Sequence, residues 1–163
     1  MTNTCGRIDT DLSKNDQFYM TVKDPRKAKL NTIHVYRRWG ITGWWLRGVD
    51  LWFSNKEKLR TYRGSKGNII YKLDVKDKKI KKIHIATYHE VKQCQPDDMS
   101  YLVIENESKE GFSEFDFGSP PQKNYHLSHS IKIPENMKII GIFGSYYKKW
   151  DDIKTLGFIL YPI

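Results

Sequence analysis

A loop near the C-terminus combines aromatic rings with carboxylates. Residues 144–152 read GSYYKKWDD and lie between two apolar runs, Met137 to Phe143 and Ile153 to Tyr161. Aromatic rings beside an aspartate offer a stacking face next to strong hydrogen-bond acceptors, a combination suited to a sugar. The pattern therefore predicts a binding site at the tip of a hairpin.

The elements that must position this site read as strands. Both flanking runs have the length and the β-branched or aromatic content of strands, so we expect a hairpin whose two strands lie in the core of one sheet. Apolar residues also alternate from Ile69 to Val75 and from Ile83 to Thr87, with a polar turn at Asp77 to Lys79. This alternation predicts a second hairpin with one buried face.

The rest of the chain shows the same alternation and no convincing helix. Tyr101 to Glu105 and Phe115 to Phe117 alternate on either side of the turn residues 106–111, and Pro120-Pro121 and Pro134 punctuate the later strands. Turn signals at a spacing of roughly 8 to 12 residues indicate an all-β barrel, sandwich or prism. Periodicity does not choose among these three, and no internal threefold repeat is visible.

The order and spacing of these segments resemble the jacalin-like lectin family. KIIGIFGSYYKKWDD followed by IKTLGFILYPI is similar to the family's apolar strand, its loop with a Gly-x-x-x-Asp sugar motif and its final glycine-containing strand. The likeness extends upstream through LNTIHVYRRW, TGWWLRGVDLWFSN, IKKIHIATYHE and SYLVIENESKEGFSEFDFG. It implies a β-prism I fold of three four-stranded antiparallel sheets with pseudo-threefold symmetry. We expect one such domain over residues 1–163, of which residues 1–17 can be flexible.

The resemblance also implies which residues would contact a sugar at one end of the prism. Two departures from the family change that pocket: Lys148 stands where the motif glycine is expected, and NDQFY (residues 15–19) stands where a Gly-Gly turn is usual. Lys148 removes a close backbone approach and adds positive charge, which favours sulfated or carboxylated glycans over neutral mannose or galactose. The implied carbohydrate-binding residues are Asp152, Ile153 through its backbone, Trp150, Tyr147, Lys148, Tyr88 and His89.

Positive charge is concentrated in the first part of the chain. Residues 1–92 contain 21 Lys and Arg against 9 Asp and Glu, whereas residues 93–163 contain 7 against 10. A solvated surface explains any single basic run, but several runs together favour an anionic partner such as phospholipid, sulfated glycan or nucleic acid. The run that we take as an anionic-ligand patch contains Lys76, Lys78, Lys79, Lys81 and Lys82.

Two functions are therefore consistent with the sequence. The first is a lectin-like module whose partner is a glycan or glycoconjugate. The second is a β-prism that has lost sugar binding and docks on an anionic phospholipid membrane, or on a protein partner, through its basic face. Nucleic-acid binding is disfavoured because the chain shows no recognition helix and no RNP-like motif. A homo-oligomer is left open.

Signals for catalysis are weak. His126 and His129 form an HxxH, but residues three apart on a strand point to opposite faces. His89 and Cys94 lack both a third ligand at a suitable spacing and an oxyanion element. We expect no catalytic residue, no metal site and no cofactor.

Targeting signals are also lacking. No run approaches the ~20 apolar residues that cross a membrane, and MTNTCGRIDTDLSKND has no apolar stretch of the kind found in secretory signals. We expect a soluble chain of unspecified compartment. Reduced thiols are the simpler interpretation of Cys5 and Cys94, and a single disulfide between them is the alternative.

Overall fold

The computed structural model describes residues 2–6, 16–40, 43–64, 69–88, 101–107, 113–116, 125–147 and 152–163. These residues form strands and turns, and no α-helix occurs among them. Twelve strands make three four-stranded antiparallel sheets. The predicted all-β class and the predicted β-prism of three four-stranded sheets are therefore confirmed.

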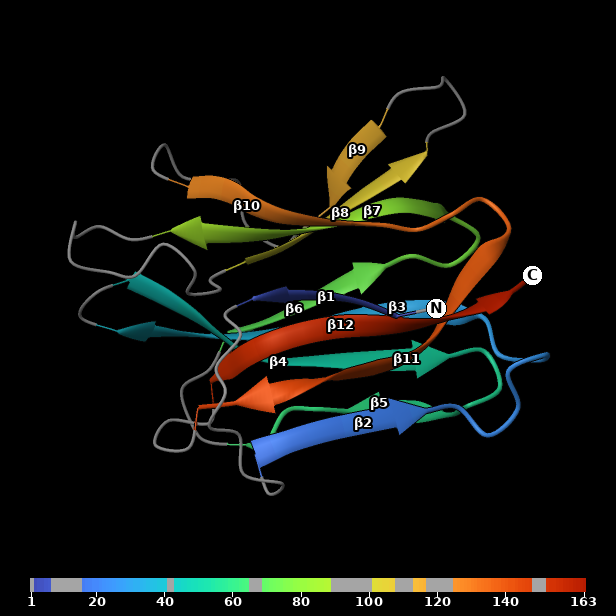
Figure 1. Ribbon diagram of the computed structural model, residues 1–163, viewed down its shortest axis with the longest axis horizontal. Helices are drawn as coiled ribbons and strands as arrows, with labels where there is room; N and C mark the ends of the chain where they lie inside the picture. Colours follow the sequence, from blue (N-terminus) through green and yellow to red (C-terminus); the bar gives the residue numbers. More distant parts are fainter. Residues whose placement is uncertain are drawn as a thin grey trace.

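Each sheet contains one long central hairpin and two edge strands, and most strands run along the long axis of the molecule (Figure 1). The sheet that we call the terminal sheet has the order β1 (Thr2–Gly6), β12 (Ile153–Pro162), β11 (Met137–Tyr146), β2 (Gln17–Thr21). The β3–β4 sheet has the order β5 (Lys58–Arg60), β4 (Gly43–Phe53), β3 (Leu30–Gly40), β6 (Ile69–Asp74). The β7–β8 sheet has the order β10 (Tyr125–Lys132), β7 (Lys79–Tyr88), β8 (Tyr101–Glu107), β9 (Ser113–Asp116).

The three sheets repeat one topology. The orders β6-β3-β4-β5 and β10-β7-β8-β9 are each a Greek key, in which the fourth strand returns to lie beside the first. In the terminal sheet, β11 and β12 take the central places, while β1 and β2 from the start of the chain supply the two edges. The pseudo-threefold symmetry is thus present in the strand order, although no repeat is visible in the sequence.

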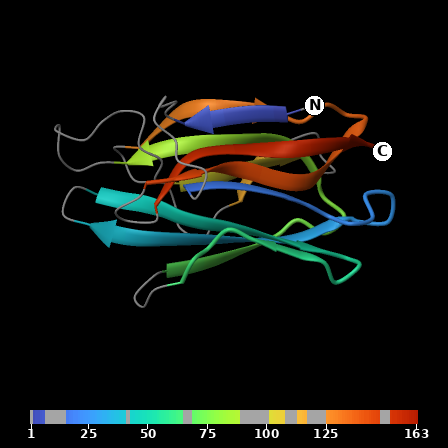
Figure 2. The same ribbon diagram turned by 60° about the horizontal axis from the view of Figure 1, so that its bottom comes forward.

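The core lies where the apolar faces of the three sheets meet. Fully buried members come from every sheet, among them Leu46, Ile83, Ile104, Ile142 and Phe158. Alternate strand residues share one face, so each sheet contributes one apolar face to this common core. Turning the molecule shows the β3–β4 sheet along one side, with the strands of the other two sheets across from it (Figure 2). As predicted, the two C-terminal strands are the central pair of one sheet.

The predicted hairpin of residues 69–75 with residues 83–87 is wrong. Among the described residues, strand β6 pairs only with β3, whereas β7 pairs with β8 and β10, so the turn between them passes from one sheet to the next. Their alternation reflects the fact that each strand buries one face, which is true of strands in different sheets as well as of paired strands. By contrast, β8 and β9 pair as their alternation suggested.

A buried carboxylate fastens the segment after β5 to the β3–β4 sheet. Asp50 is fully buried and accepts hydrogen bonds from the backbone N–H of Thr61 (2.9 Å) and of Tyr62 (3.2 Å) and from Nε of Arg60 (3.2 Å). Burial raises the pKa of the neighbouring Tyr36 phenol, and the Asp50 carboxylate adds to that shift. The carbonyl of Thr61 in turn accepts a hydrogen bond from the Tyr146 hydroxyl, which connects this sheet to the terminal sheet.

Tyr62 approaches β4 so closely that the strand needs a glycine at position 48. A Cβ added to Gly48 would lie 2.7 Å from the Cβ of Tyr62, a distance that real Cβ atoms essentially never show. With no side chain at this position, the Tyr62 ring stacks on Tyr36 at a centroid distance of 3.9 Å and an interplanar angle of 8°. Gly48 therefore has a packing role in this strand.

A second carboxylate fastens the segment after β2 to the β4–β5 turn. Glu57 accepts hydrogen bonds from the backbone N–H of Lys23 (2.6 Å) and from Nδ2 of Asn55 (2.6 Å). The Lys23 N–H is the main reason that the pKa of the Glu57 carboxyl is lowered from its usual value. A carboxyl whose pKa is depressed in the folded state stabilises the fold above its unfolded pKa, and this contribution disappears as the pH falls through the folded pKa.

We predict that Glu57→Gln lowers the free energy of unfolding at neutral pH and that the difference from the wild type shrinks as the pH is lowered below the ordinary glutamate range. Urea denaturation at several pH values measures this. Glu135→Gln is the matched control, since this exposed carboxylate forms only a surface ion pair, 3.6 Å from Lys79, and such pairs contribute little. A difference for Glu57→Gln that does not vary with pH would show that the charge of the carboxylate is irrelevant.

Candidate functional site

The strand ends that border the three central hairpin connections lie at one end of the prism. Strands β3, β7 and β11 end there, and β4, β8 and β12 begin there, whereas both chain termini lie toward the opposite end (Figure 1). We call the first of these the hairpin end. The predicted sugar-binding residues lie in, or next to, two of the connections at this end, between β7 and β8 and between β11 and β12.

Asp152 lies at the hairpin end, immediately before β12, and binds an arginine of another sheet. Its Oδ1 accepts a hydrogen bond from Nε of Arg38 at 3.0 Å, and its Oδ2 accepts one from Nη2 of Arg38 at 2.7 Å. Nε of Arg47 lies 3.8 Å from Oδ1. A bidentate arginine–carboxylate pair of this kind is among the strongest polar contacts in proteins.

The exposure expected for Asp152 needs a correction. The sequence suggests a carboxylate at the end of an exposed loop, but Asp152 is only 3% exposed. Its side chain is covered because the β11–β12 hairpin packs beside the β3–β4 hairpin, from which Arg38 replaces water as its hydrogen-bond donor. Asp152 therefore contributes to the joint between two sheets, whatever ligand binds nearby.

A β-bulge explains how the Arg47 side chain reaches Asp152. In the register of β3 with β4, Tyr36 pairs with Gly48 and Arg37 pairs with Leu46, so Arg47 is an extra residue on β4. Bulges of this kind redirect a side chain and bend the strand. On the neighbouring strand, the guanidinium of Arg38 lies 5.7 Å from the ring centroid of Trp45, a cation–π distance that adds to its positioning.

Further positive charge lies on β12, two residues after Asp152. Lys154 is largely buried, and its Nζ lies 5.6 Å from the ring centroid of Tyr147. The backbone N–H of Tyr147 donates to the carbonyl of Asp152 at 2.8 Å, which draws the two ends of the loop together. The described part of the hairpin end therefore places two arginines against the Asp152 carboxylate and a lysine beside the Tyr147 ring.

The other predicted sugar-binding residues are placed less fully. Ile153 is buried and begins β12, and Tyr88 ends β7, where its backbone pairs with Tyr125. The side chain of Tyr88 lies outside the described residues, as do the whole of Trp150, Lys148 and His89.

The predicted anionic-ligand patch lies far from these residues, at the turn between β6 and β7. Lys76, Lys78 and Lys79 are exposed there, whereas Lys81 and Lys82 are half-buried within β7. Arg37 and Arg38 are adjacent and form another basic run in the sequence. Arg37 is buried, so it adds no charge to the surface. The basic residues thus belong to several separate places.

Sequence reasoning did not identify Arg38 and Arg47 as partners of Asp152. The only signal was the presence of Arg38 in a basic pair, because its contact with Asp152 joins residues 114 positions apart. It also missed a polar chain across the β7–β8 sheet. Nδ1 of His84 lies 2.6 Å from Oγ of Ser130, and its Nε2 lies 2.8 Å from Oε2 of Glu105. These three residues come from neighbouring strands, so we interpret them as a cross-strand network that stabilises the sheet.

Metal-binding clusters and membrane-spanning helices are other features that a chain of this kind could contain. Within the described residues, no group of three or more His, Cys, Asp or Glu side chains is arranged to hold a metal ion. In the same part of the chain, no helix has the length and apolar character needed to span a membrane.

We predict that the Arg38–Asp152 pair stabilises the joint between the sheets. Arg38→Met should lower the free energy of unfolding by about 2–3 kcal/mol, because it leaves a buried carboxylate without its bidentate donor. The double variant with Asp152→Ala should be less destabilised than the sum of the two single variants, since each removes the same contact. Urea denaturation of the four proteins measures the coupling, and additive effects would contradict a direct interaction.

Comparison with known proteins identifies the fold. No protein-family model matches the sequence, and no curated protein matches it. Among solved structures, Malaysian banana lectin aligns with a TM-score of 0.54 at 12% identity, over 100% of this chain and 99% of that chain. Calystegia sepium agglutinin gives 0.52 at 13% identity over 100% and 98%, and artocarpin in a mannopentose complex gives 0.52 at 12% identity over 98% and 97%. The chain therefore has the β-prism fold of the jacalin-like lectins.

Proposed function

We propose that the chain is a non-enzymatic carbohydrate-binding module and that it binds acidic or sulfated glycans at the hairpin end. The fold supports the general part of this proposal, because the proteins that share it are lectins, and one of them, artocarpin, was solved with mannopentose. The charge at the hairpin end supports the preference for anionic glycans.

The observation that carries the proposal is the bidentate pair of Arg38 with Asp152. In a lectin of this type, sugar hydroxyls would donate to the motif carboxylate, but here two of its roughly four acceptor positions are occupied by Arg38. A neutral sugar would have to share or displace that donor. The guanidinium groups instead offer N–H donors, which suit sulfate and carboxylate acceptors.

The arginines are also accessible enough to serve this purpose. The side chain of Arg38 is 25% exposed and that of Arg47 is 16% exposed, whereas that of Asp152 is 4% exposed. A ligand approaching the hairpin end would therefore meet cationic groups before it met the carboxylate. Trp150, Tyr147, Tyr88 and His89 are proposed to supply the stacking and polar contacts to the sugar ring, with Lys148 adding positive charge and Ile153 a backbone contact.

We predict that a sulfated disaccharide binds more tightly than mannose or galactose and that its affinity falls between low and high salt. Exposed charges attract one another over a Debye length of only ~8 Å at physiological ionic strength, so added salt screens the attraction. Arg47→Gln should weaken the sulfated ligand about tenfold, because a charge-assisted hydrogen bond is lost. Titration calorimetry measures both effects.

The matched control for this test is Lys72→Gln. It removes one positive charge from an exposed position of β6 in the same sheet and should leave affinity unchanged. Melting temperatures would verify that both variants fold. Equal affinity for neutral and sulfated sugars, or equal behaviour of Arg47→Gln and Lys72→Gln, would contradict the preference for anionic glycans.

A second candidate function rests on the turn between β6 and β7. Lys76, Lys78 and Lys79 are exposed there, and the side chain of Lys79 remains 46% exposed despite its ion pair with Glu135. Exposed lysines on one turn suit an anionic phospholipid surface, where each contributes about 1 kcal/mol. This candidate does not involve the hairpin end, so the two functions can be tested separately.

For this candidate, we predict that the protein sediments with phosphatidylglycerol vesicles at low salt. The double variant Lys76→Glu with Lys78→Glu should lower the apparent affinity for these vesicles at least tenfold. The control reverses two exposed lysines elsewhere, Lys27→Glu with Lys72→Glu. Retention no greater than that by phosphatidylcholine vesicles would eliminate membrane docking.

A further inference from the structure

A pocket of about 720 Å³ opens at the end of the prism opposite the hairpin end. Its walls come from the beginnings of β3 and β11, the end of β12, and the two turns that precede β7 and β11. We call it the terminal pocket. Its volume lies within the range of pockets that bind small molecules in proteins.

The floor of the terminal pocket is apolar and continuous with the core. Val75, Ile133 and Ile139 line it and belong to the buried core cluster. Leu30 and Met137 also line it and are partly buried against that cluster. An aliphatic chain or a flat apolar ring would bury its surface against these side chains, which favours a ligand with an apolar body.

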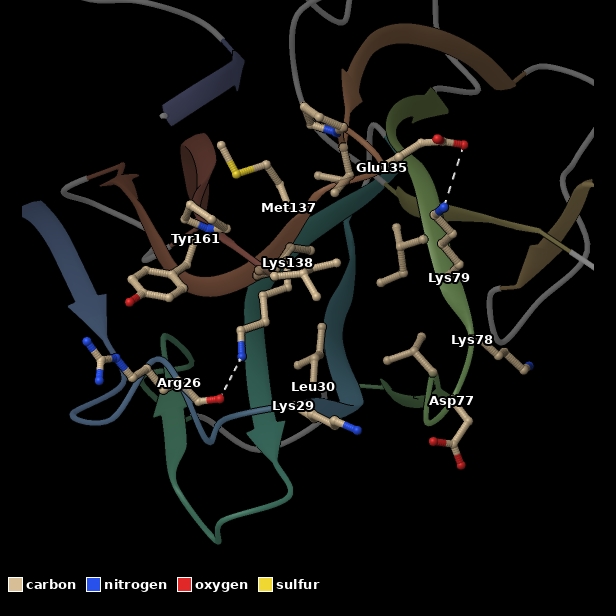
Figure 3. Close-up of a pocket in the computed structure, with 17 residues that line it drawn as sticks. Arg26, Lys29, Leu30, Asp77, Lys78, Lys79, Glu135, Met137, Lys138 and Tyr161 are labelled. Carbon is tan, nitrogen blue, oxygen red and sulfur yellow. Dashed lines mark hydrogen bonds and ion pairs between the residues drawn. The ribbon is translucent and has the colours of Figure 1, made fainter.

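The rim of the pocket is strongly charged, with more positive than negative groups. Figure 3 shows these side chains spread around the pocket, with Arg26 and Tyr161 on one side, Lys78 and Lys79 on the other, and Lys138 between them. The charged lining residues are Arg26, Lys29, Lys78, Lys79, Lys138, Asp77 and Glu135, which give a formal excess of three positive charges.

Lys138 is held in place by neutral acceptors. Its Nζ donates to the carbonyl of Ala28 at 2.9 Å and to that of Arg26 at 3.3 Å. Both partners are neutral, so they position the ammonium group without offsetting its charge as a carboxylate would. An ammonium has three N–H donors, which is one more than these two carbonyls use. Arg26 and Lys29 are exposed on the same turn and add their charges beside it.

We propose that the terminal pocket binds a single-chain anionic amphiphile, whose apolar chain lies on the floor and whose carboxylate, sulfate or phosphate group lies against Lys138, Arg26 and Lys29. An apolar floor alone would suit many ligands, but the positive rim on one side selects a negatively charged head group. This site is independent of the glycan site, because it is formed at the other end of every strand that it uses.

The probe for this proposal is decanoate below its micellar concentration. Methyl NMR spectra of the whole protein should show shifts at Met137, Ile133 and Ile139, and calorimetry should show an affinity that decreases with salt. 1-Decanol, which has the same chain and no charge, should bind at least tenfold more weakly, and acetate, which has the charge and no chain, should not bind. Equal affinity for decanoate and 1-decanol, or no methyl shifts, would overturn the proposal.

Two matched variants test the positive rim. Lys29→Gln should weaken decanoate about fivefold to tenfold, because it removes one charged partner of the head group. Lys27→Gln makes the same change on the same turn, at an exposed residue that does not line the pocket, and should have no effect. Equal effects of the two variants would overturn the assignment of the head group to this side.

A third variant and a vesicle measurement complete the test. Met137→Trp replaces a linear side chain with a bulky indole ring in the pocket. It should abolish binding of decanoate and 1-decanol while sulfated-glycan binding persists. Phosphatidylglycerol vesicles distinguish a free amphiphile from a lipid within a bilayer. Retention by vesicles with no binding of decanoate would overturn the pocket proposal in favour of docking on the membrane surface.

Discussion

Closure of three half-apolar sheets around one core is the constraint on which the rest of this structure depends. Each sheet has a face that must leave water, and three such faces bury one another only if all the sheets are complete. The terminal sheet is complete only when β1 and β2 from the start of the chain reach the hairpin of β11 and β12 from its end. The prism therefore closes through contacts between residues that are far apart in the sequence.

Hydrogen-bonded carboxylates secure this closure where different segments meet, and two of them, Asp50 and Asp152, are buried. Asp50 binds the segment after β5, Glu57 binds the segment after β2, and Asp152 binds Arg38 across two sheets. A buried carboxylate is costly unless its hydrogen bonds are satisfied, so Asp50 and Asp152 are stable in these places only when the segments that they join are both in place. This makes the polar joints specific for one arrangement of the sheets, in addition to the less specific attraction of apolar surfaces.

The same architecture separates two chemically different ends. At the hairpin end, Arg38 and Arg47 lie against one carboxylate, and Lys154 lies beside the Tyr147 ring. At the opposite end, where Met137 begins β11, an apolar floor is surrounded by a positive rim. We propose an anionic ligand for each end, and among the described residues the extended apolar surface belongs to the terminal pocket. This difference is the reason that we propose a glycan for the first end and an amphiphile for the second.

The sequence by itself determined the all-β class, the C-terminal hairpin and, through a family resemblance, the β-prism. Strand periodicity and turn residues are local properties, so Met137 to Phe143 and Ile153 to Tyr161 could be assigned without any knowledge of their neighbours. It did not determine every strand partner: β6 and β7 alternate alike but belong to different sheets. Nor did it show that Asp152 is buried against Arg38, that Arg37 is buried, or that Lys138 lies at a pocket. Those features were decided only by the tertiary structure. Burial and ion pairing depend on distances in space, and the separation of two residues along the chain does not reveal how far apart they lie in the fold.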